Sequence, residues 1–200
     1  MTDPRVRAED LTAKARVRNI ALDLYSKHGA DRISLRAVAA EAGVTLGLVQ
    51  HHYKTKAGLR DAVDQLVVDY FATALAEVPE ADHPTDLADA RDQAVRRMLQ
   101  ANQAVVDYVR RAVLDPSGEN LHLVDALVNL TEREVGRLRN AGRASTKRRR
   151  STQVVAVLVR QMGELLLAPL VDAVWDRMDD ADRPKPRLQI TVVETGRPTS

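Results

Sequence analysis

The chain has 200 residues, 44% of them hydrophobic, and a formal net charge of +2. This length and apolar content suffice to bury a hydrophobic core. The chain contains no cysteine, which excludes disulfides, thiolate catalysis and cysteine-ligated zinc and suits a reducing cytoplasm. The first ten residues lack the apolar segment of a secretory signal, and the most apolar stretch, 154–170, is interrupted by Arg160, Gln161 and Glu164. We therefore expect neither secretion nor a membrane-spanning helix.

Charge is distributed unevenly along the chain. Residues 1–60 carry 11 Lys/Arg and 6 Asp/Glu, whereas the remaining 140 residues carry 19 and 22. A basic segment beside a neutral or acidic body is typical of a nucleic-acid-binding head. Chance variation in solvated surface charge is the alternative, and the asymmetry alone does not exclude it.

The first predicted element is a helix that ends at Gly29. Its apolar residues recur at spacings of three and four: Ala13, Val17, Ile20, Ala21 and Leu24. This spacing places them on one face of a helix, which we expect to pack over the elements that follow.

Residues 34–53 predict a helix-turn-helix. Ser34 is a good N-cap for a short helix over 35–42, in which the small Ala39 lets a second helix cross closely. Gly43 permits the positive φ of a tight turn between the two helices. Thr45 caps the second helix, which has Leu48 or Val49 facing inward and these residues facing outward: Leu46, Gly47, Gln50 and His51. Such a helix is a candidate reader of the major groove, although Ala-rich hairpins with a glycine turn also occur inside ordinary bundles.

Directly after this helix stands the sequence YKTKAGL, residues 53–59. With the helix-turn-helix before it, this segment resembles the tetracycline-repressor-like (TetR) family of bacterial regulators. In that family the recognition helix ends in a Tyr/His-aromatic pattern followed by Lys-x-Lys-x-x-Leu. The match covers about residues 12–75, and beyond residue 80 it rests on length and helical pattern alone.

The resemblance implies an all-α protein. Its N-terminal three-helix helix-turn-helix domain would be followed by a C-terminal helical bundle for ligand binding and dimerisation. We place the DNA-binding domain with its connecting helix at 1–78, the effector-binding and dimerisation domain at 79–183, and an extended or disordered tail at 184–200.

The rest of the sequence predicts mainly helices. They are a connecting helix over 56–76, a long or bent helix from a cap at Thr85 to Leu114, a helix over 119–140 and, after a loop over 142–151, an apolar helix over about 152–167. Pro169 forces a kink or a restart before a last segment over 170–178. Residues 188–192 alternate like a strand but have no sheet to join, so we expect an extended arm on the body or on a partner. Disorder of the last residues is the alternative.

DNA contacts can be assigned on and around the second helix of the pair. Arg36 is similar to the family position that reaches a base or a phosphate, and Thr45 could contact phosphate through its hydroxyl or the nearby amides. Gln50 stands where the family usually carries Tyr, and its carboxamide can pair with adenine N6 and N7. Leu46 could contact a thymine methyl, and Gly47 would let the backbone approach the DNA. We therefore expect few direct base contacts, and we expect the shape of the operator to contribute to specificity.

The residues that end this helix are also DNA candidates. His51 and His52 point about 100° apart on a helix and have no third ligand nearby, so we expect no metal site. The resemblance makes His52 a phosphate contact and His51 an edge residue of the same surface. Lys54 and Lys56 would clamp phosphates. For Arg36 and both lysines, plain surface charge is the alternative, and we expect Tyr53 to pack in the core of the head.

Two other basic groups receive a weaker assignment. Arg5 and Arg7 could form an arm in a minor groove, but chain termini often carry such residues without function. The run KRRR at 147–150 is expected to keep a loop soluble and to interact with carbonyls at the end of the preceding helix.

The C-terminal part is expected to dimerise and to bind an effector. The resemblance implies that residues 152–178 form a four-helix bundle with a second copy, and it places a pocket among residues 87–175. Candidate lining residues, for which ordinary core packing is the alternative, are Met98, Asn102, Val105, Tyr108, Val109, Leu127, Met162, Leu166 and Trp175. An aromatic content of 3% favours a small, largely apolar effector over a stacked aromatic one.

We therefore predict a cytoplasmic, homodimeric, DNA-binding repressor that binds a palindromic double-stranded operator and is released by a small effector. The connecting helix would be the only continuous rigid element that links the head to the body, and therefore the natural lever. The chain shows no catalytic spacing of His and carboxylates and no cofactor or metal motif. A DNA-binding protein without an effector and, less favoured, a helical-bundle enzyme are the alternatives.

Overall fold

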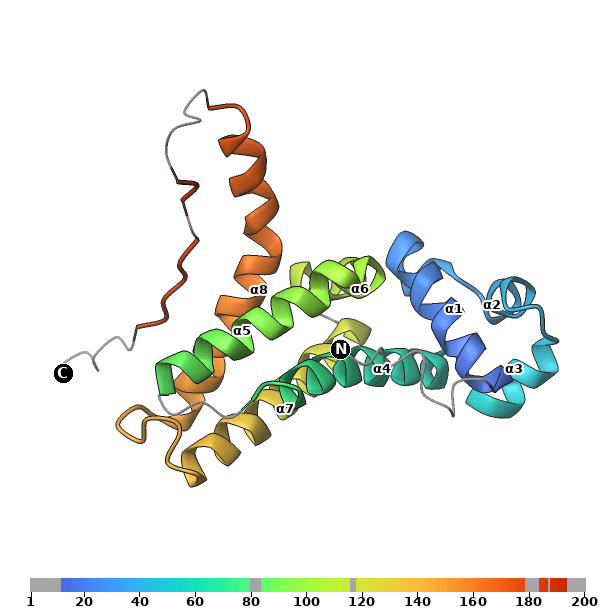
Figure 1. Cartoon of the computed structure of the whole chain (residues 1–200). Helices are drawn as coiled ribbons and strands as arrows, with labels where there is room; N and C mark the ends of the chain where they lie inside the picture. The colour runs from blue at the N-terminus through green and yellow to red at the C-terminus, as the bar shows by residue number, and fades with distance from the viewer. Residues whose placement is uncertain (1–11, 80–83, 116–117, 179–183, 187, 194–200) are drawn as a thin grey trace, which may run out of the picture. The chain divides into compact units, whose positions relative to one another are not determined.

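The computed structural model describes residues 12–79, 84–115, 118–178, 184–186 and 188–193 (Figure 1). Within these residues all regular structure is helical, in eight α-helices and two short 3-10 helices, which confirms the predicted all-α class. The chain divides into two compact units, residues 1–127 and 128–200. The boundary predicted at 78/79 divides the chain by function and stays a prediction; the helices that follow it pack on the N-terminal ones. The arm assigned to Arg5 and Arg7 lies outside the described residues.

Side-chain caps fix where the helices of the head begin. The head consists of α1 (Ala13–His28), the 3-10 helix η3 (Ala30–Arg32), α2 (Leu35–Glu41) and α3 (Leu46–Tyr53). The hydroxyls of Thr12, Ser34 and Thr45 each accept a hydrogen bond from the amide three residues on, at 3.2–3.3 Å. Each hydroxyl satisfies one of the amides that a helix start leaves free. The caps predicted at Ser34 and Thr45 are confirmed.

Small and branched side chains fill the core of the head. Val17, Val38 and Val49 are fully buried. Ala39 is buried as well, and α2 packs against both α1 and α3. Gly43 has a φ of 65°, as the tight turn requires. The hairpin predicted for residues 34–53 is therefore present, with Val49 as its inward-facing residue.

A tight corner joins α3 to α4 (Lys56–Ala76). Lys54 has φ 64° and ψ −57°, and Thr55 N donates to Tyr53 O at 2.7 Å. These values define a γ-turn of the rare, strained kind. The first turn of α4 lies against this corner so closely that a Cβ on Gly58 would overlap the Tyr53 carbonyl oxygen. The glycine of the YKTKAGL segment is thus required by packing.

The helix expected over 85–114 is two helices. α5 spans Pro84–Ala101 and α6 spans Gln103–Leu114, and Asn102 between them has φ −133° and ψ 74°. The Asn102 side-chain amide donates to Met98 O at 2.8 Å, while its own carbonyl accepts from Val105 N at 3.0 Å. Asn102 thus ends one helix and begins the next, as its preference for caps allows.

Two helices, not one, connect the head to the rest of its unit. α4 packs against α5, and α1 packs against α6. Arg111 on α6 donates from Nε to Ser26 O at 3.1 Å and from Nη2 to Lys27 O at 2.9 Å. These carbonyls belong to the last turn of α1, which has no further helical amides to bond. α4 remains the continuous element expected to act as the lever, and the contact of α1 with α6 adds a second link that the sequence did not indicate.

The helix α7 (Leu121–Asn140) crosses from the first unit into the second. In the second unit, α8 (Arg150–Trp175) is continuous, with Pro169 inside it. The expected kink or restart, and the expected end near residue 167, are therefore not observed. The loop before α8 is held by Arg139, whose Nη1 donates to Ser145 O at 3.1 Å and to Arg148 O at 2.9 Å.

One face of α8 carries exposed apolar side chains. They are Val155, Val159, Leu167, Leu170 and Val174, spaced mostly by three or four residues. By length and composition alone, α8 is the one helix in the described part of the chain that could cross a membrane. Of its most apolar 18-residue stretch, 11% is buried. This differs from the expectation based on its interrupting polar residues. A single such helix is weak evidence of a membrane span, because apolar interface helices have the same composition.

The described part of the tail contains no regular secondary structure and runs beside α8 (Figure 1). Lys185 forms an ion pair with Asp172. The side chain of Ile190 lies where a Cβ on Gly163 would be, so the glycine leaves a notch that this isoleucine occupies. Residues 194–200, also assigned to the tail, lie outside the described residues.

Candidate nucleic-acid interface

The outward face of α3 is the candidate reading surface. Val49 is fully buried and the Tyr53 ring is buried, with its hydroxyl donating to Lys14 O at 2.5 Å. Gln50 and His51 are exposed, as is Gly47, and Leu46 is half-buried. The helix is thus fixed from inside by Val49 and Tyr53, which leaves the predicted base-reading residues free to approach DNA.

The residues assigned to phosphates lie at both ends of α3 and on its neighbours. Arg36 on α2 is exposed, and Thr45 is exposed at the start of α3. His52 is half-buried at the other end, and its ring meets those of its neighbours edge to face. Exposure of this kind is compatible with the assigned contacts.

The two lysines differ in their surroundings. Lys54 is exposed at the strained corner after α3. Lys56 is half-buried, and its Nζ donates to the backbone carbonyl of Asp31 at 2.8 Å. Lys56 therefore already has an acceptor inside the protein, which sequence reasoning could not find because Asp31 precedes it by 25 residues.

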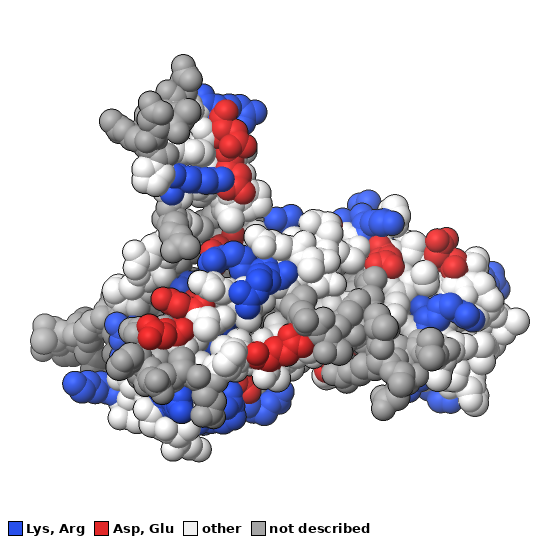
Figure 2. Space-filling model, in the orientation of Figure 1, with Lys and Arg blue, Asp and Glu red and all other residues white. Residues whose placement is uncertain are grey.

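Basic side chains do not form a continuous patch on the face of the head seen in Figure 2, where separate Lys/Arg and Asp/Glu groups alternate.

The effector-pocket candidates are mostly core residues. Met98, Val105, Val109 and Leu127 are buried within the first unit, and Met162 is buried in the second. Asn102 uses its amide to bond Met98 O. Leu166 is half-buried, and Trp175 lines an apolar cavity at the C-terminal end of α8. Of these candidates, Tyr108 lines the cavity described next.

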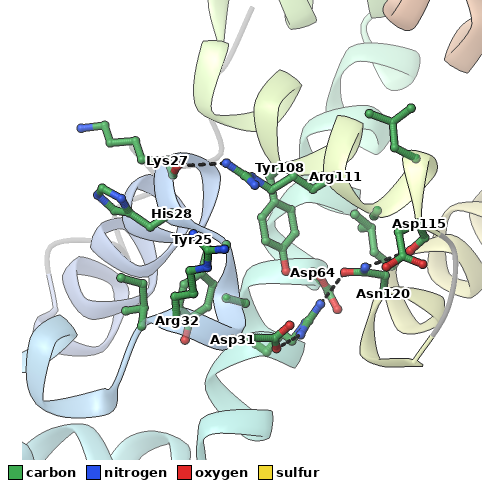
Figure 3. Close-up of a pocket in the computed structure, with 17 residues that line it drawn as sticks. Tyr25, Lys27, His28, Asp31, Arg32, Asp64, Tyr108, Arg111, Asp115 and Asn120 are labelled. Carbon is green, nitrogen blue, oxygen red and sulfur yellow. Dashed lines mark hydrogen bonds and ion pairs between the residues drawn. The ribbon is translucent and has the colours of Figure 1, made fainter.

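A cavity of about 810 Å³ lies between the end of α1 with η3, the start of α4, and α6 with the 3-10 helix η4 (Gly118–Asn120). Asp64 and Tyr108 lie next to each other in it, and the other lining residues include Asp31, Arg111 and Asn120 (Figure 3). The Tyr108 hydroxyl donates to Asp64 Oδ1 at 2.7 Å. Arg60 donates to Asn120 Oδ1 at 2.6 Å and pairs with Asp31 at 3.4 Å.

Burial determines the protonation of Asp64. Removal of the carboxyl from water raises its pKa from 3.8 to about 6, against the opposing effects of the Tyr108 hydrogen bond and the Arg60 charge. Nearby Asp61 raises this pKa further and His122 lowers it. Burial also raises the pKa of the Tyr108 hydroxyl, with the Asp64 charge acting in the same direction. The hydroxyl therefore remains a donor.

We expect Asp64 to destabilise the fold as the pH rises from 4 to 7. Its folded pKa lies above its unfolded value, so the folded state holds the proton more tightly, and stability is lost as the carboxyl ionises near pH 6. A shift of about two pKa units corresponds to a loss of at most about 3 kcal/mol in the free energy of unfolding. Urea unfolding at several pH values should show that Asp64→Asn removes this decline.

Asp61→Asn is the matched control for that experiment. Asp61 lies one turn earlier on α4 and is exposed, and its charge is a minor cause of the raised Asp64 pKa, so its loss should leave most of the decline in place. A decline of equal size in the Asp64→Asn protein would show that another group causes it.

The head, with a buried hairpin that presents one face of a short helix, defines a helix-turn-helix protein of the DNA-binding class. A family model described as bacterial regulatory proteins, tetR family, matches residues 19–63, from within α1 into α4. This region is therefore similar to the DNA-binding part of TetR-family regulators. The resemblance seen in the sequence is confirmed.

Curated relatives match over the same region. The HTH-type transcriptional regulatory protein RaaS of Mycobacterium tuberculosis is 40% identical over 80 residues, which are 40% of this chain and 37% of RaaS. An HTH-type transcriptional regulator of Staphylococcus aureus is 30% identical over 70 residues, which are 35% of this chain and 38% of that protein. The match thus spans less than two fifths of each relative. These relatives are transcriptional regulators and not enzymes.

Solved structures align with a larger part of this chain than the curated relatives do. A tetR-family transcription regulator from Shewanella sp. PV-4 aligns with a TM-score of 0.63 at 21% identity, over 83% of this chain and 90% of that chain. The multidrug binding protein EbrR aligns with a TM-score of 0.59 at 23% identity, over 78% of this chain and 79% of that one. At these identities the alignments establish a shared fold alone.

Proposed function

We propose that this protein is a cytoplasmic transcriptional repressor that binds a near-palindromic operator as a homodimer and leaves it when a small effector binds. The observation that carries the proposal is the α2–α3 hairpin, whose second helix is held by Val49 and Tyr53 and presents Gln50 and His51 outward. The family match to the same residues supports it.

Dimerisation follows from the limited reach of one reading helix. A single short helix contacts few base pairs, so useful specificity in a genome requires two coupled heads. The exposed apolar face of α8 offers a surface for a second copy: Leu170 is 59% exposed and Val174 52%. Apolar patches of this kind on a chain of moderate size mark interaction surfaces. The pair of reading helices would then be about 34–36 Å apart, or a multiple of it.

The first test separates phosphate contacts from base contacts. Lys56→Ala should weaken binding about equally for all DNA sequences and reduce the salt slope by roughly 0.9, because one phosphate contact is lost. Lys147→Ala, in the basic loop of the second unit, is the charge-matched control and should leave the slope unchanged. An unchanged slope for Lys56→Ala would mean that Lys56 keeps its bond to Asp31 on DNA.

Selection of bound duplexes from a random pool would give the operator. Gln50→Ala should relax the preference at one base pair by about 1–3 kcal/mol, because a bidentate contact to adenine is lost. Selection of the same sequences by the variant would remove Gln50 from the reading surface. Recovery of no preferred sequence by the unaltered protein would overturn the proposed function as a whole.

A further inference from the structure

We propose that the cavity between α1, η3 and α6 binds a small organic cation, a molecule with one protonated amine or amidine on an apolar body. In assigning this cavity the role of effector site, the inference rests on the proposed function. The site lies within the first unit, next to the head, and involves one of the pocket residues expected from the sequence, Tyr108.

Asp64 is the recognition group. It is 4% exposed and lines the cavity, and although its Oδ1 accepts from Tyr108, its Oδ2 accepts no hydrogen bond. A buried carboxylate oxygen without a donor is costly, because its desolvation is not offset. An N–H group of a bound cation would supply the missing donor and a compensating charge.

The walls of the cavity suit an apolar body of moderate size. Tyr25 and the ring of Tyr108 line it (Figure 3), together with Ile33, Ala112 and Leu123. Its volume of about 810 Å³ lies in the range of small-molecule sites, which combine apolar walls with a few placed polar groups.

The charges around Asp64 favour a single cationic nitrogen. Inside the cavity, Arg60 donates to Asp31 and Asn120, and Arg111 donates to two carbonyls of α1. Because these arginines already donate to acceptors of the protein, we do not expect them to bind an anion. Exposed basic side chains among the lining residues would repel a polyamine: Lys27, His28 and Arg32.

A chain of contacts leads from the cavity to the DNA-binding surface. Asp64 Oδ2 is closed to solvent, so an entering cation must displace a neighbouring side chain, and the charge of Arg60 acts directly on Asp64. Arg60 pairs with the Asp31 carboxylate, and the Asp31 carbonyl accepts from Lys56 Nζ at 2.8 Å. Displacement of Arg60 would therefore alter the position of a proposed phosphate contact.

The test compares three probes that share a phenyl body: phenethylamine, 2-phenylethanol and 3-phenylpropionate. Calorimetric titration of the full chain should show binding of the amine and at least about tenfold weaker binding of the alcohol and the acid. Asp64→Asn should weaken amine binding by about tenfold or more, as expected for loss of a charged hydrogen bond. Asp61→Asn, the neighbouring exposed acid on α4, should not. Equal binding of amine and alcohol, or no binding of the amine, would overturn the proposal.

An exposed lining residue keeps the test decisive if Asp64→Asn fails to fold. Leu114 lines the cavity and is 72% exposed, so a charge there should not disturb the core. Leu114→Glu should strengthen amine binding and Leu114→Lys should weaken it, each by a few-fold, because a surface charge acts through solvent. Effects of the same sign would show that the amine binds elsewhere.

The link to DNA is measured separately. Saturating phenethylamine should weaken binding to the selected operator, and operator DNA should weaken amine binding by the same factor, as linkage requires. Amine binding that leaves DNA affinity unchanged would overturn the effector role. Because amine binding is measured without DNA and operator selection without amine, failure of the site and failure of the DNA-binding function give different results.

Discussion

Gly58→Ala is expected to destabilise the head by about 2–4 kcal/mol, a large effect for one methyl group. The added Cβ would overlap the Tyr53 carbonyl oxygen, and that oxygen is held by the hydrogen bond from Thr55 N. Since neither atom belongs to a flexible side chain, the corner between α3 and α4 must open. Chemical unfolding would report the stability loss, and DNA affinity should fall with it because α3 is displaced.

Gly47→Ala is the matched control within the same motif. Gly47 lies in α3, and a Cβ there would meet nothing closer than Thr45 Oγ1 at 4.0 Å. Its replacement should leave stability unchanged or raise it by about 0.5 kcal/mol, as alanine favours helices over glycine. Equal stability losses for the two variants would refute the packing explanation for Gly58.

Two acidic residues on α8 are expected to convert the proposed dimer to monomers of 22.1 kDa. Leu167→Glu combined with Leu170→Glu would bury two unpaired charges in the proposed interface, which is unfavourable by several kcal/mol. Operator affinity should fall by about 10²- to 10⁴-fold, because two heads would no longer bind as one linked pair. Light scattering and DNA titration would measure both effects.

The control for this variant places the same change elsewhere. Leu121 is also an exposed leucine, 44%, and lies outside α8 and outside the cavity lining. Its replacement by glutamate should leave the mass and operator affinity unchanged. A protein that is still dimeric with both α8 charges, and still folded by circular dichroism, would show that another surface forms the dimer.

The head could be predicted from sequence because local chemistry determines it. Ser34 and Thr45 cap their helices through amides three residues away, and Gly43 provides a positive φ, so short-range rules suffice. The limits of the connecting helix, Lys56–Ala76, follow equally from the pattern before Pro79. The strained γ-turn at Lys54 gave no such signal, since lysine has no preference for that conformation.

Features that depend on distant residues could not be predicted. Tyr108 meets Asp64 across 44 residues, and Arg111 bonds Ser26 across 85. No periodicity encodes such pairs, so the cavity and the contact of α1 with α6 were missed. At Pro169, a local rule gave the wrong result: a proline removes one amide and crowds the preceding turn, yet the helix continues through it.

The Gly58 corner has a mechanical consequence for α4. Because the first turn of α4 packs closely against the Tyr53 carbonyl at the end of α3, the two helices should rotate together as one rigid body. α4 has 21 residues, so its length is about 31 Å. A tilt of about 6° about its far end would therefore move the α3 end by about 3 Å, roughly the length of one hydrogen bond. A displacement of that size on each of two heads is enough to separate base-reading side chains from their partners, without unfolding any element of the head.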